Sequence, residues 1–296
     1  MEETASNQIC PIRYEVPGAK VTTYNIGGPL KFLFEPNSTQ ELQALVKSLS
    51  SENRSFKVLG GGSNLLIPSQ GVDDPVIRLG NGFKYWENKG EGIIQVGASM
   101  PLIRLSQETA QAGLSGLEFA GGIPASFGGA VRMNAGAHGG DISQILDRVT
   151  ILTYDGALEE VAANRLDYGY RRSNIGSLGI VVSATIKMKS GDKDKILELR
   201  AKNLAHRKSA QPITIPSAGS IFKNPSSDIT AGIIIERAGL KGFKVGGAEI
   251  STMHGNWILN PDRLATSEDV KSCISEVQRV VQEKFGIALE TELVAW

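Results

Sequence analysis

Two glycine-rich tracts carry the clearest chemical signal in this sequence. The first, residues 60–64, reads Gly-Gly-Gly-Ser-Asn. Because glycine has no Cβ, such a tract lets backbone N–H groups closely approach an anion such as a phosphate. It is neither a Gly-x-Gly-x-x-Gly nor a Walker A motif, since Pro68 and Gly71 interrupt the next residues and no Gly-Lys-Ser/Thr comes after it. Taken alone, the tract is equally compatible with an anion site and with a tight turn.

The second tract covers residues 121–137. It begins Gly-Gly-Ile-Pro-Ala-Ser-Phe-Gly-Gly-Ala and continues from Met133 as Met-Asn-Ala-Gly-Ala. Paired glycines around Pro124 predict a rigid turn, and Ser126 and Asn134 offer hydrogen-bonding side chains. A buried bend between two tightly packed layers explains the same residues at least as well.

The composition excludes several classes of protein. The chain has 296 residues, of which 34 are glycine and 41% are hydrophobic, so it is globular rather than collagenous or disordered. Lys plus Arg and Asp plus Glu balance at 31 each, which argues against a nucleic-acid partner. Cys10 and Cys273 form no Cys-x-x-Cys pair, and with three histidines we expect no metal site. The sequence has no signal-peptide or membrane-spanning pattern, so we expect a soluble, cytoplasmic protein without a membrane partner.

The elements that must hold the tracts follow from periodicity and capping. Ser38 and Glu41 have the spacing of a capping box before a helix, whose buried face is expected to hold Leu42, Leu45, Val46 and Leu49 at i, i+3, i+4 and i+7. Thr266 with Asp269 marks a second helix start. Asp155-Gly156 predicts a hairpin turn. A charged helix after Lys193 is expected to bury Leu197, Ala201, Leu204 and Ala205, and the helix after Pro101 to bury Leu102, Leu105 and Ala112. The predicted strands are residues 56–59, 93–98, 149–154, 157–161, 179–188 and 287–296.

The order of these elements indicates an α+β fold. Strands and helices alternate irregularly and include a hairpin, which is unlike regular βαβ winding. The polar stretch around residues 190–193 predicts a domain boundary near 190–195, and residues 1–18 are expected to form an extended arm.

Four further motifs accompany the glycine tracts in order. They are Tyr24-Asn25-Ile26-Gly27-Gly28, Tyr168-Gly169-Tyr170-Arg171-Arg172-Ser173, Ala218-Gly219-Ser220-Ile221-Phe222-Lys223-Asn224-Pro225 and Ala238-Gly239-Leu240-Lys241-Gly242. This ordered set resembles the UDP-N-acetylenolpyruvoylglucosamine reductase (UDP-N-acetylmuramate dehydrogenase) family over roughly residues 20–295. The short interval between Asn224 and Glu236 resembles the family's shorter, type II subclass. Ala125 departs from the pattern, because a glycine is usual there.

The resemblance implies a fold and an activity. The expected fold is the vanillyl-alcohol-oxidase type, with an FAD-binding domain at residues 1–192 (subdomains 19–78 and 79–192) and an α/β substrate-binding domain at 193–296. FAD would be bound tightly and non-covalently, and NADPH would be the co-substrate. The implied reaction reduces UDP-N-acetylenolpyruvoylglucosamine to UDP-N-acetylmuramate in peptidoglycan precursor synthesis, with a monomer as the expected state.

The resemblance also assigns residues. The cofactor-binding set is Tyr24, Ile26, Gly60, Gly61, Gly62, Ser63, Asn64, Leu65, Gly121, Gly122, Ile123, Pro124, Ser126, Gly129, Asn134, Ala135, Gly136, Ile180 and Val182. The substrate-binding set is Tyr170, Lys208, Lys223 and Asn224. His254 and Asn256 are expected to be structural, and covalent attachment of flavin at His138 is the less favoured alternative.

Three residues receive catalytic roles from the resemblance. Arg171 is expected to neutralise charge beside the substrate carboxylate, since a guanidinium stays charged and binds carboxylates bidentately; a surface ion pair is the alternative. Ser220 is the expected proton donor, although most serines of this kind serve turns or caps. Glu292 is expected to assist protonation, but in a terminal strand Glu290 would share its face, so the choice between them stays open.

Two other functions fit parts of the pattern. One is an oxidase of sugars or hydroxy acids with the same fold, but such an enzyme needs a base where Ser220 offers a proton donor. The other is a non-catalytic flavin-binding protein, and the polar residues at all three catalytic positions argue against it.

Overall fold

The structure is a computed structural model that describes residues 9–226 and 228–296; residues 1–8 of the expected N-terminal arm lie outside this range. The described chain divides into two compact units. Unit 1 comprises residues 9–14, Phe32–Gly61 and Asp74–Ala205, and unit 2 comprises Glu15–Lys31, Gly62–Asp73 and His206–Trp296. These units do not coincide with the expected division near residue 192, and the predicted subdomains stay a prediction. No helix in the described part of the chain is long and apolar enough to span a membrane.

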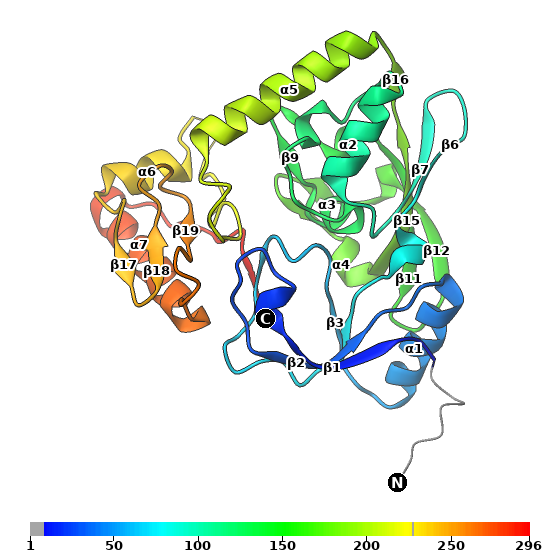
Figure 1. The fold of residues 1–296 in the computed structure, drawn as a ribbon, viewed down its shortest axis with the longest axis horizontal. Helices are drawn as coiled ribbons and strands as arrows, with labels where there is room; N and C mark the ends of the chain where they lie inside the picture. The colour runs from blue at the N-terminus through cyan, green and yellow to red at the C-terminus, as the bar shows by residue number, and fades with distance from the viewer. Residues whose placement is uncertain (1–8, 227) are drawn as a thin grey trace. The chain divides into compact units, whose positions relative to one another are not determined.

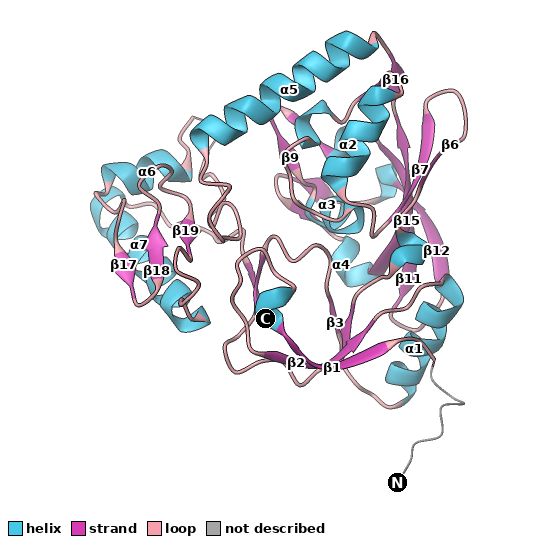
Figure 2. Cartoon of the chain, in the orientation of Figure 1, coloured by secondary structure: helices cyan, strands magenta, loops and turns pink. Residues whose placement is uncertain are grey.

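A five-stranded antiparallel sheet is the frame of unit 1 (Figures 1 and 2). Its order is β12-β11-β15-β7-β6, with β6 at Trp86–Asn88, β7 at Ile93–Gly97, β11 at Leu146–Thr153, β12 at Leu158–Ala162 and β15 at Gly179–Lys187. The Asp155-Gly156 hairpin between β11 and β12 is confirmed. The central strand β15 is buried on both faces: Ile180 and Val182 belong to one apolar cluster, and Ala184 and Ile186 to another.

A smaller sheet contains parallel strand pairs. The chain forms β1 (Ile12–Pro17), β2 (Pro29–Phe34), β3 (Lys57–Val58) and β5 (Val76–Ile77) in the order β1-β2-β5-β3. Phe34 pairs with Ile77, so the residues that follow β2 and β5 come to the same edge. Helix α1 (Thr39–Ser51) buries Leu42, Leu45, Val46 and Leu49, as predicted from their spacing. Its cap differs from a full capping box, because Glu41 accepts the N–H of Asn37 rather than that of Ser38.

Helix α2 of unit 1 precedes the second glycine tract along the chain, and helix α3 lies within that tract. Helix α2 (Leu102–Gln111) buries Leu102 and Leu105 as expected, but Ala112 is its exposed C-cap, and Ser106 and Thr109 complete the buried face. Helix α3 (Phe127–Met133) continues the second tract and contacts β15 and β7. The remaining elements of unit 1 are α4 (Ile175–Leu178), β8 (Leu114–Ser115), β9 (Gly136–Ala137), β10 (Gly140–Asp141), β13 (Tyr168–Gly169), β14 (Arg172–Ser173) and β16 (Lys189–Ser190).

Helix α5 (Lys193–Ala210) corrects the prediction of its buried face. Ile196 and Arg200 are its buried residues, whereas Ala201 and Ala205 are exposed and Leu197 and Leu204 are half-buried. The buried guanidinium of Arg200 donates to the hydroxyl of Ser106 at 3.1 Å. The prediction was wrong because it followed apolar residues, while the protein buries a long charged side chain that finds a polar partner.

Unit 2 has its own sheet and core. Strands β17 (Lys244–Val245), β18 (Ala248–Ile250) and β19 (Ile258–Leu259) form an antiparallel sheet, and helices α6 (Ala231–Arg237) and α7 (Ser267–Phe285) accompany it. Helix α7 begins with the predicted Thr266–Asp269 capping box and ends at Gly286, whose φ of +67° suits glycine. The segment expected to form a strand over 287–296 is mostly irregular: Thr291 makes one bridge with Phe222, and β20 (Val294–Ala295) pairs in parallel with β4 (Leu65–Leu66).

Candidate active site

The two glycine tracts border a cavity of about 770 Å³ in unit 1. Six of the predicted cofactor-binding residues line it, namely Gly60, Gly61, Pro124, Ser126, Gly129 and Ile180. A Cβ on Gly60 would lie 2.7 Å from the hydroxyl of Ser126, and one on Gly61 would lie 3.0 Å from the Ser126 nitrogen. The close approach of the tracts therefore depends on glycine at these positions.

The cavity offers hydrogen-bond donors from the backbone. In the described chain, the N–H groups of Gly60 and Gly61 have no hydrogen-bond acceptor. By contrast, Phe127 and Gly128, at the start of α3, donate to the carbonyls of Met100 and Ala98, so those donors are already used. Unpaired backbone N–H groups beside a cavity of this size fit the phosphates of a dinucleotide.

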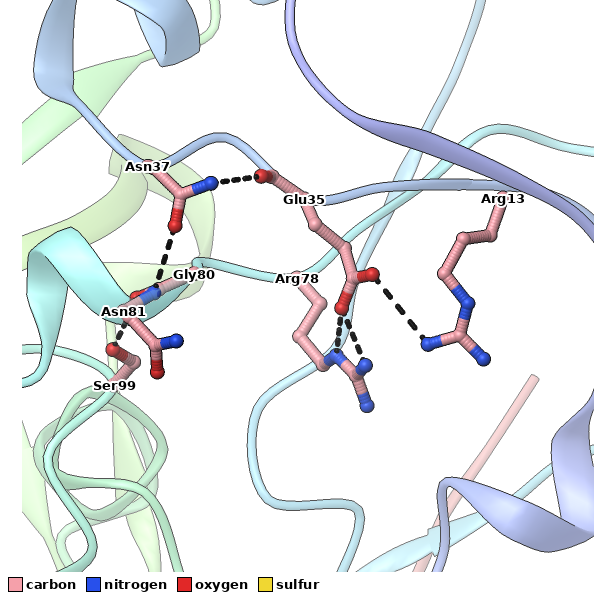
Figure 3. A network of polar contacts seen from close by, with 7 residues as sticks. All are labelled: Arg13, Glu35, Asn37, Arg78, Gly80, Asn81 and Ser99. Atoms are coloured by element: carbon pink, nitrogen blue, oxygen red, sulfur yellow. Dashed lines mark hydrogen bonds and ion pairs between the residues drawn. The ribbon is translucent and has the colours of Figure 1, made fainter.

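A polar network at the rim of this cavity was not anticipated from the sequence (Figure 3). Arg78 Nε donates to Glu35 Oε1 at 3.0 Å, and Arg13 lies 3.5 Å from the other carboxylate oxygen. The side chain of Asn37 donates to the Glu35 carbonyl and accepts the N–H of Asn81. Glu35 and Arg78 meet because they directly follow the paired parallel strands β2 and β5. Assigning those two strands from the sequence would have placed these residues at one edge.

Arg171 lies in a two-residue turn between β13 and β14. Tyr168 pairs with Ser173, and Gly169 pairs with Arg172, so Tyr170 and Arg171 form the tip. Arg171 has a φ of +56°, which is uncommon and strained for a residue with a Cβ. Its guanidinium donates to the Gly136 carbonyl at 2.6 Å and lies 5.1 Å from the centre of the Tyr170 ring.

The hairpin that carries Arg171 is attached to the second glycine tract. Asn134, which is 3% exposed, donates from Nδ2 to the Gly169 carbonyl at 3.1 Å and accepts the Ser143 N–H at 3.0 Å. The Tyr168 hydroxyl donates to the Val131 carbonyl, and burial raises its pKa. The Ser173 hydroxyl donates to the Arg132 carbonyl. Both ends of the Asn134 amide are thus engaged in holding the hairpin and residue 143.

Ser220 lies in unit 2, after a glycine with a φ of +77° at position 219. The residues that follow it are paired on two sides. Ile221 donates to the Asn256 carbonyl at 3.0 Å and accepts the N–H of Glu292 at 2.8 Å. The structure therefore brings the backbones of Ser220 and Glu292 into neighbouring segments of the same unit.

The side chains of Glu290 and Glu292 have different surroundings. Glu290 Oε2 lies 3.1 Å from Lys223 Nζ, and its side chain is 76% exposed. Glu292 is half-buried, and its carbonyl accepts the side chain of Asn64, a residue of the first tract. Both residues flank Thr291, which makes a β-bridge with Phe222, so their contacts rather than a difference of face distinguish them.

Several other predicted residues have side chains that pack in the core, cap a helix or are exposed. Tyr24 and Ile26 are buried in the core of unit 2, and Leu65 lies in β4, so their side chains serve packing. The Asn224 side chain accepts the N–H of Ala231 at the start of α6. Lys208 is exposed on α5.

The remaining predicted cofactor residues lie next to the cavity-lining positions along the chain. Val181 lines the cavity, whereas its neighbour Val182 is packed in an apolar cluster. Gly62 has a φ of +64°, and a Cβ there would lie 2.1 Å from the Val21 carbonyl. Besides Tyr24, Ile26, Leu65 and Asn134, the predicted cofactor residues outside the cavity lining are Gly62, Ser63, Asn64, Gly121, Gly122, Ile123, Ala135, Gly136 and Val182.

The structure explains the residues at positions 138 and 125, which the sequence singled out. His138 and Gly139 both have positive φ and form the turn between β9 and β10, where His138 is exposed. Ala125 lies outside the left-handed region, so its Cβ is tolerated where a glycine is usual.

Comparisons with known proteins identify the family. The profile described as "FAD binding domain" matches residues 30–162, and that of the "UDP-N-acetylenolpyruvoylglucosamine reductase, C-terminal domain" matches residues 211–296. UDP-N-acetylenolpyruvoylglucosamine reductase of Bacillus subtilis is 39% identical over 99% of this chain and 96% of its own length. The chain belongs to this reductase family. UDP-N-acetylenolpyruvoylglucosamine reductase 1 of Bacillus cereus is 40% identical over 94% of this chain and 92% of its own length.

A solved structure supports the same assignment. The crystal structure of UDP-N-acetylenolpyruvylglucosamine reductase from Thermus caldophilus has a TM-score of 0.83 and 40% identity, covering 96% of this chain and 99% of that one. The predicted family, the α+β fold class with an FAD-binding domain and the FAD-dependent oxidoreductase activity with NADPH as reductant are confirmed.

Proposed function

We propose that this protein reduces UDP-N-acetylenolpyruvoylglucosamine to UDP-N-acetylmuramate, using NADPH and bound FAD. The observation that carries the proposal is the match to the Bacillus subtilis reductase across 99% of the chain, which includes every motif of the predicted site. The cavity beside Gly60, Gly61, Ser126 and Gly129 supports a tightly bound dinucleotide. When bound, FAD supplies the redox chemistry, taking hydride from NADPH and giving it to the enolpyruvyl alkene.

Arg171 is the residue that we assign to the substrate carboxylate. Hydride addition to the alkene carbon remote from the carboxylate leaves negative charge beside that carboxylate, so a fixed cation stabilises the transition state. The guanidinium is held at the tip of the β13–β14 hairpin by its bond to Gly136, which supports a fixed orientation. Neighbouring Arg172 instead pairs with Asp167 at 3.3 Å and is exposed, which supports the choice of Arg171.

Ser220 and Glu292 are assigned to the proton. Ser220 would donate it to the carbon next to the carboxylate, and Glu292 would assist that transfer. Glu290 is paired with Lys223 at the surface, which supports Glu292 as the catalytic carboxylate. The proposed substrate contacts are Lys223, Asn224, Lys208 and Tyr170. Lys223 would release Glu290 in order to bind the substrate.

One assay tests the proposed function. The purified protein should be yellow, and its oxidation of NADPH should require UDP-N-acetylenolpyruvoylglucosamine and yield UDP-N-acetylmuramate. A yellow protein that consumes oxygen with simple sugars would instead establish an oxidase. A protein that stays colourless after reconstitution with FAD would contradict the proposal altogether. A cytoplasmic location and a monomeric state belong to the same proposal, and sedimentation of the purified holoenzyme tests the second.

A further inference from the structure

Asn256 has an unusual relation to the segment that follows Ser220. It is 3% exposed, and both ends of its side-chain amide bind a single residue, Phe222. Oδ1 accepts the Phe222 N–H at 2.9 Å, and Nδ2 donates to the Phe222 carbonyl at 2.8 Å. Its own carbonyl accepts the Ile221 N–H at 3.0 Å. One buried residue thus makes three hydrogen bonds to two consecutive residues, Ile221 and Phe222.

The two side-chain bonds of Asn256 lie on the edge of the 221–223 segment opposite to Glu292. In an extended segment, the N–H and C=O groups of successive residues point to alternate edges. The Ile221 carbonyl and the Lys223 N–H bond to Glu292 and Glu290 on one edge, at 2.8 and 2.9 Å. The Phe222 groups point to the other edge, where the Asn256 amide takes the place of a partner strand. Asn256 therefore fixes the orientation of the peptides between Ser220 and the terminal segment.

Asn256 is itself held by its neighbours. His254 Nδ1 accepts the Asn256 N–H at 3.2 Å, which requires the neutral imidazole, and burial lowers the pKa of His254. Lys241 lowers this pKa further, while Glu236 opposes that change. The Ser251 hydroxyl accepts the His254 N–H. A Cβ on Gly255 would lie 2.6 Å from the Gly232 carbonyl, so this turn packs directly on α6.

We propose that Asn256 is a positioning residue that sets Ser220 and Glu292 for the protonation step. The inference rests on the proposed function, because it takes the roles of those two residues from it. An apolar residue could fill the same volume, but it would leave the Phe222 N–H and carbonyl unpaired inside the protein. Phe222 would then shift to find new partners, and a resulting displacement of about 1 Å at nearby Ser220 costs on the order of 100-fold in rate.

The test separates the two half-reactions of the holoenzyme in Asn256→Ala and Asn256→Asp. Aspartate keeps the acceptor for Phe222 but cannot donate to its carbonyl. We expect flavin reduction by NADPH to stay within about twofold of the wild type, and reoxidation by the UDP-enolpyruvyl sugar to fall about 100-fold at saturating substrate. Val277→Ala, a truncation in the same core, is the control for lost stability and should leave both half-reactions unchanged.

A double-mutant cycle shows whether Asn256 acts through Ser220. In a Ser220→Ala background, Asn256→Ala should cost less than about threefold, because the group that it positions is gone. An equal cost in both backgrounds would overturn the proposal, and so would single variants that reoxidise at the wild-type rate. If neither variant retains FAD, Asn256 is a folding residue and the proposal is also overturned. A wild-type enzyme inactive with the sugar would instead refute the proposed function itself.

Discussion

The turn that carries Arg171 and the segment that carries Ser220 are held in different ways. Arg171 is at a strained hairpin tip. Four hydrogen bonds join residues of this hairpin to residues 131–136. The segment after Ser220 depends mainly on one residue, Asn256, which binds two successive residues, Ile221 and Phe222. Both arrangements use a buried asparagine, but Asn134 joins two separate segments whereas Asn256 pairs with one. Distributed support predicts tolerance to single changes, and concentrated support predicts sensitivity.

The largest expected effect is at Ser220. Ser220→Ala removes the proposed proton donor, and general acid catalysis contributes about 10² to 10⁴ in rate. We expect reoxidation of the reduced flavin by the UDP-enolpyruvyl sugar to fall by about that factor, with flavin reduction by NADPH unchanged. Stopped-flow absorbance of the flavin measures both rates. Equal losses in both half-reactions would remove Ser220 from this role.

The adjacent arginines of the hairpin provide a matched pair. Arg171→Ala removes the cation proposed to face the substrate carboxylate and should slow substrate reduction on the order of 10²-fold. Arg172→Ala removes an exposed ion pair with Asp167 and should change the rate by less than about twofold. Steady-state rates with varied sugar concentration compare the two. If Arg172→Ala has the larger effect, the assignment of Arg171 is wrong.

The contrast between the two asparagines is tested at Asn134. Asn134→Ala loses its bonds to Gly169 and Ser143, while Tyr168, Ser173 and Arg171 still bind the tract. Leaving those groups unpaired costs about 1 to 3 kcal/mol of stability. We expect substrate reduction to fall about tenfold or less, well below the loss in Asn256→Ala. Thermal unfolding and the same rate assay measure these effects, and similar losses in the two variants would abolish the contrast.

The smallest effect concerns pH and the support of Asn256. Burial lowers the pKa of folded His254 below its usual 6.5, so the unfolded chain binds a proton more readily. Stability should therefore be fully present above pH 6.5 and fall as the pH drops below it. His254→Gln should weaken this dependence, whereas His206→Gln, at an exposed position, should not. Thermal midpoints at pH 5.5 and 7.5 test this, and unchanged dependence in His254→Gln would exclude His254 as the cause.

Local signals allowed much of the fold to be predicted from the sequence. The Thr266–Asp269 box, the Asp155-Gly156 turn and the apolar face of α1 each depend on residues close in sequence, and all three are found. Long-range pairing was out of reach. The parallel pair β2–β5, which brings Glu35 beside Arg78, leaves no local pattern, because each strand contributes two residues to that pairing.

The candidate site, too, was predicted only as far as local sequence signals reach. The glycines that line the cavity could be recognised, since their requirement for a missing Cβ is a property of residue type. The distinction between Glu290 and Glu292 could not, because it depends on the pairing of Lys223 with Glu290 and on the partial burial of Glu292. The role of Asn256 was hidden too, as its partner is 34 residues away.

The most direct test of the proposed mechanism is a turnover in deuterated water. Holoenzyme, NADPH and UDP-N-acetylenolpyruvoylglucosamine are mixed in D₂O, and the product is analysed by mass spectrometry and proton NMR. The mechanism predicts UDP-N-acetylmuramate with deuterium at the carbon next to the carboxylate, because the proton comes from an exchangeable hydroxyl. The remote carbon is not diagnostic, since hydride that passes through reduced flavin is carried there on a solvent-exchangeable N–H. Hydrogen in place of deuterium at the carbon next to the carboxylate, or NADPH oxidation without this product, would contradict it.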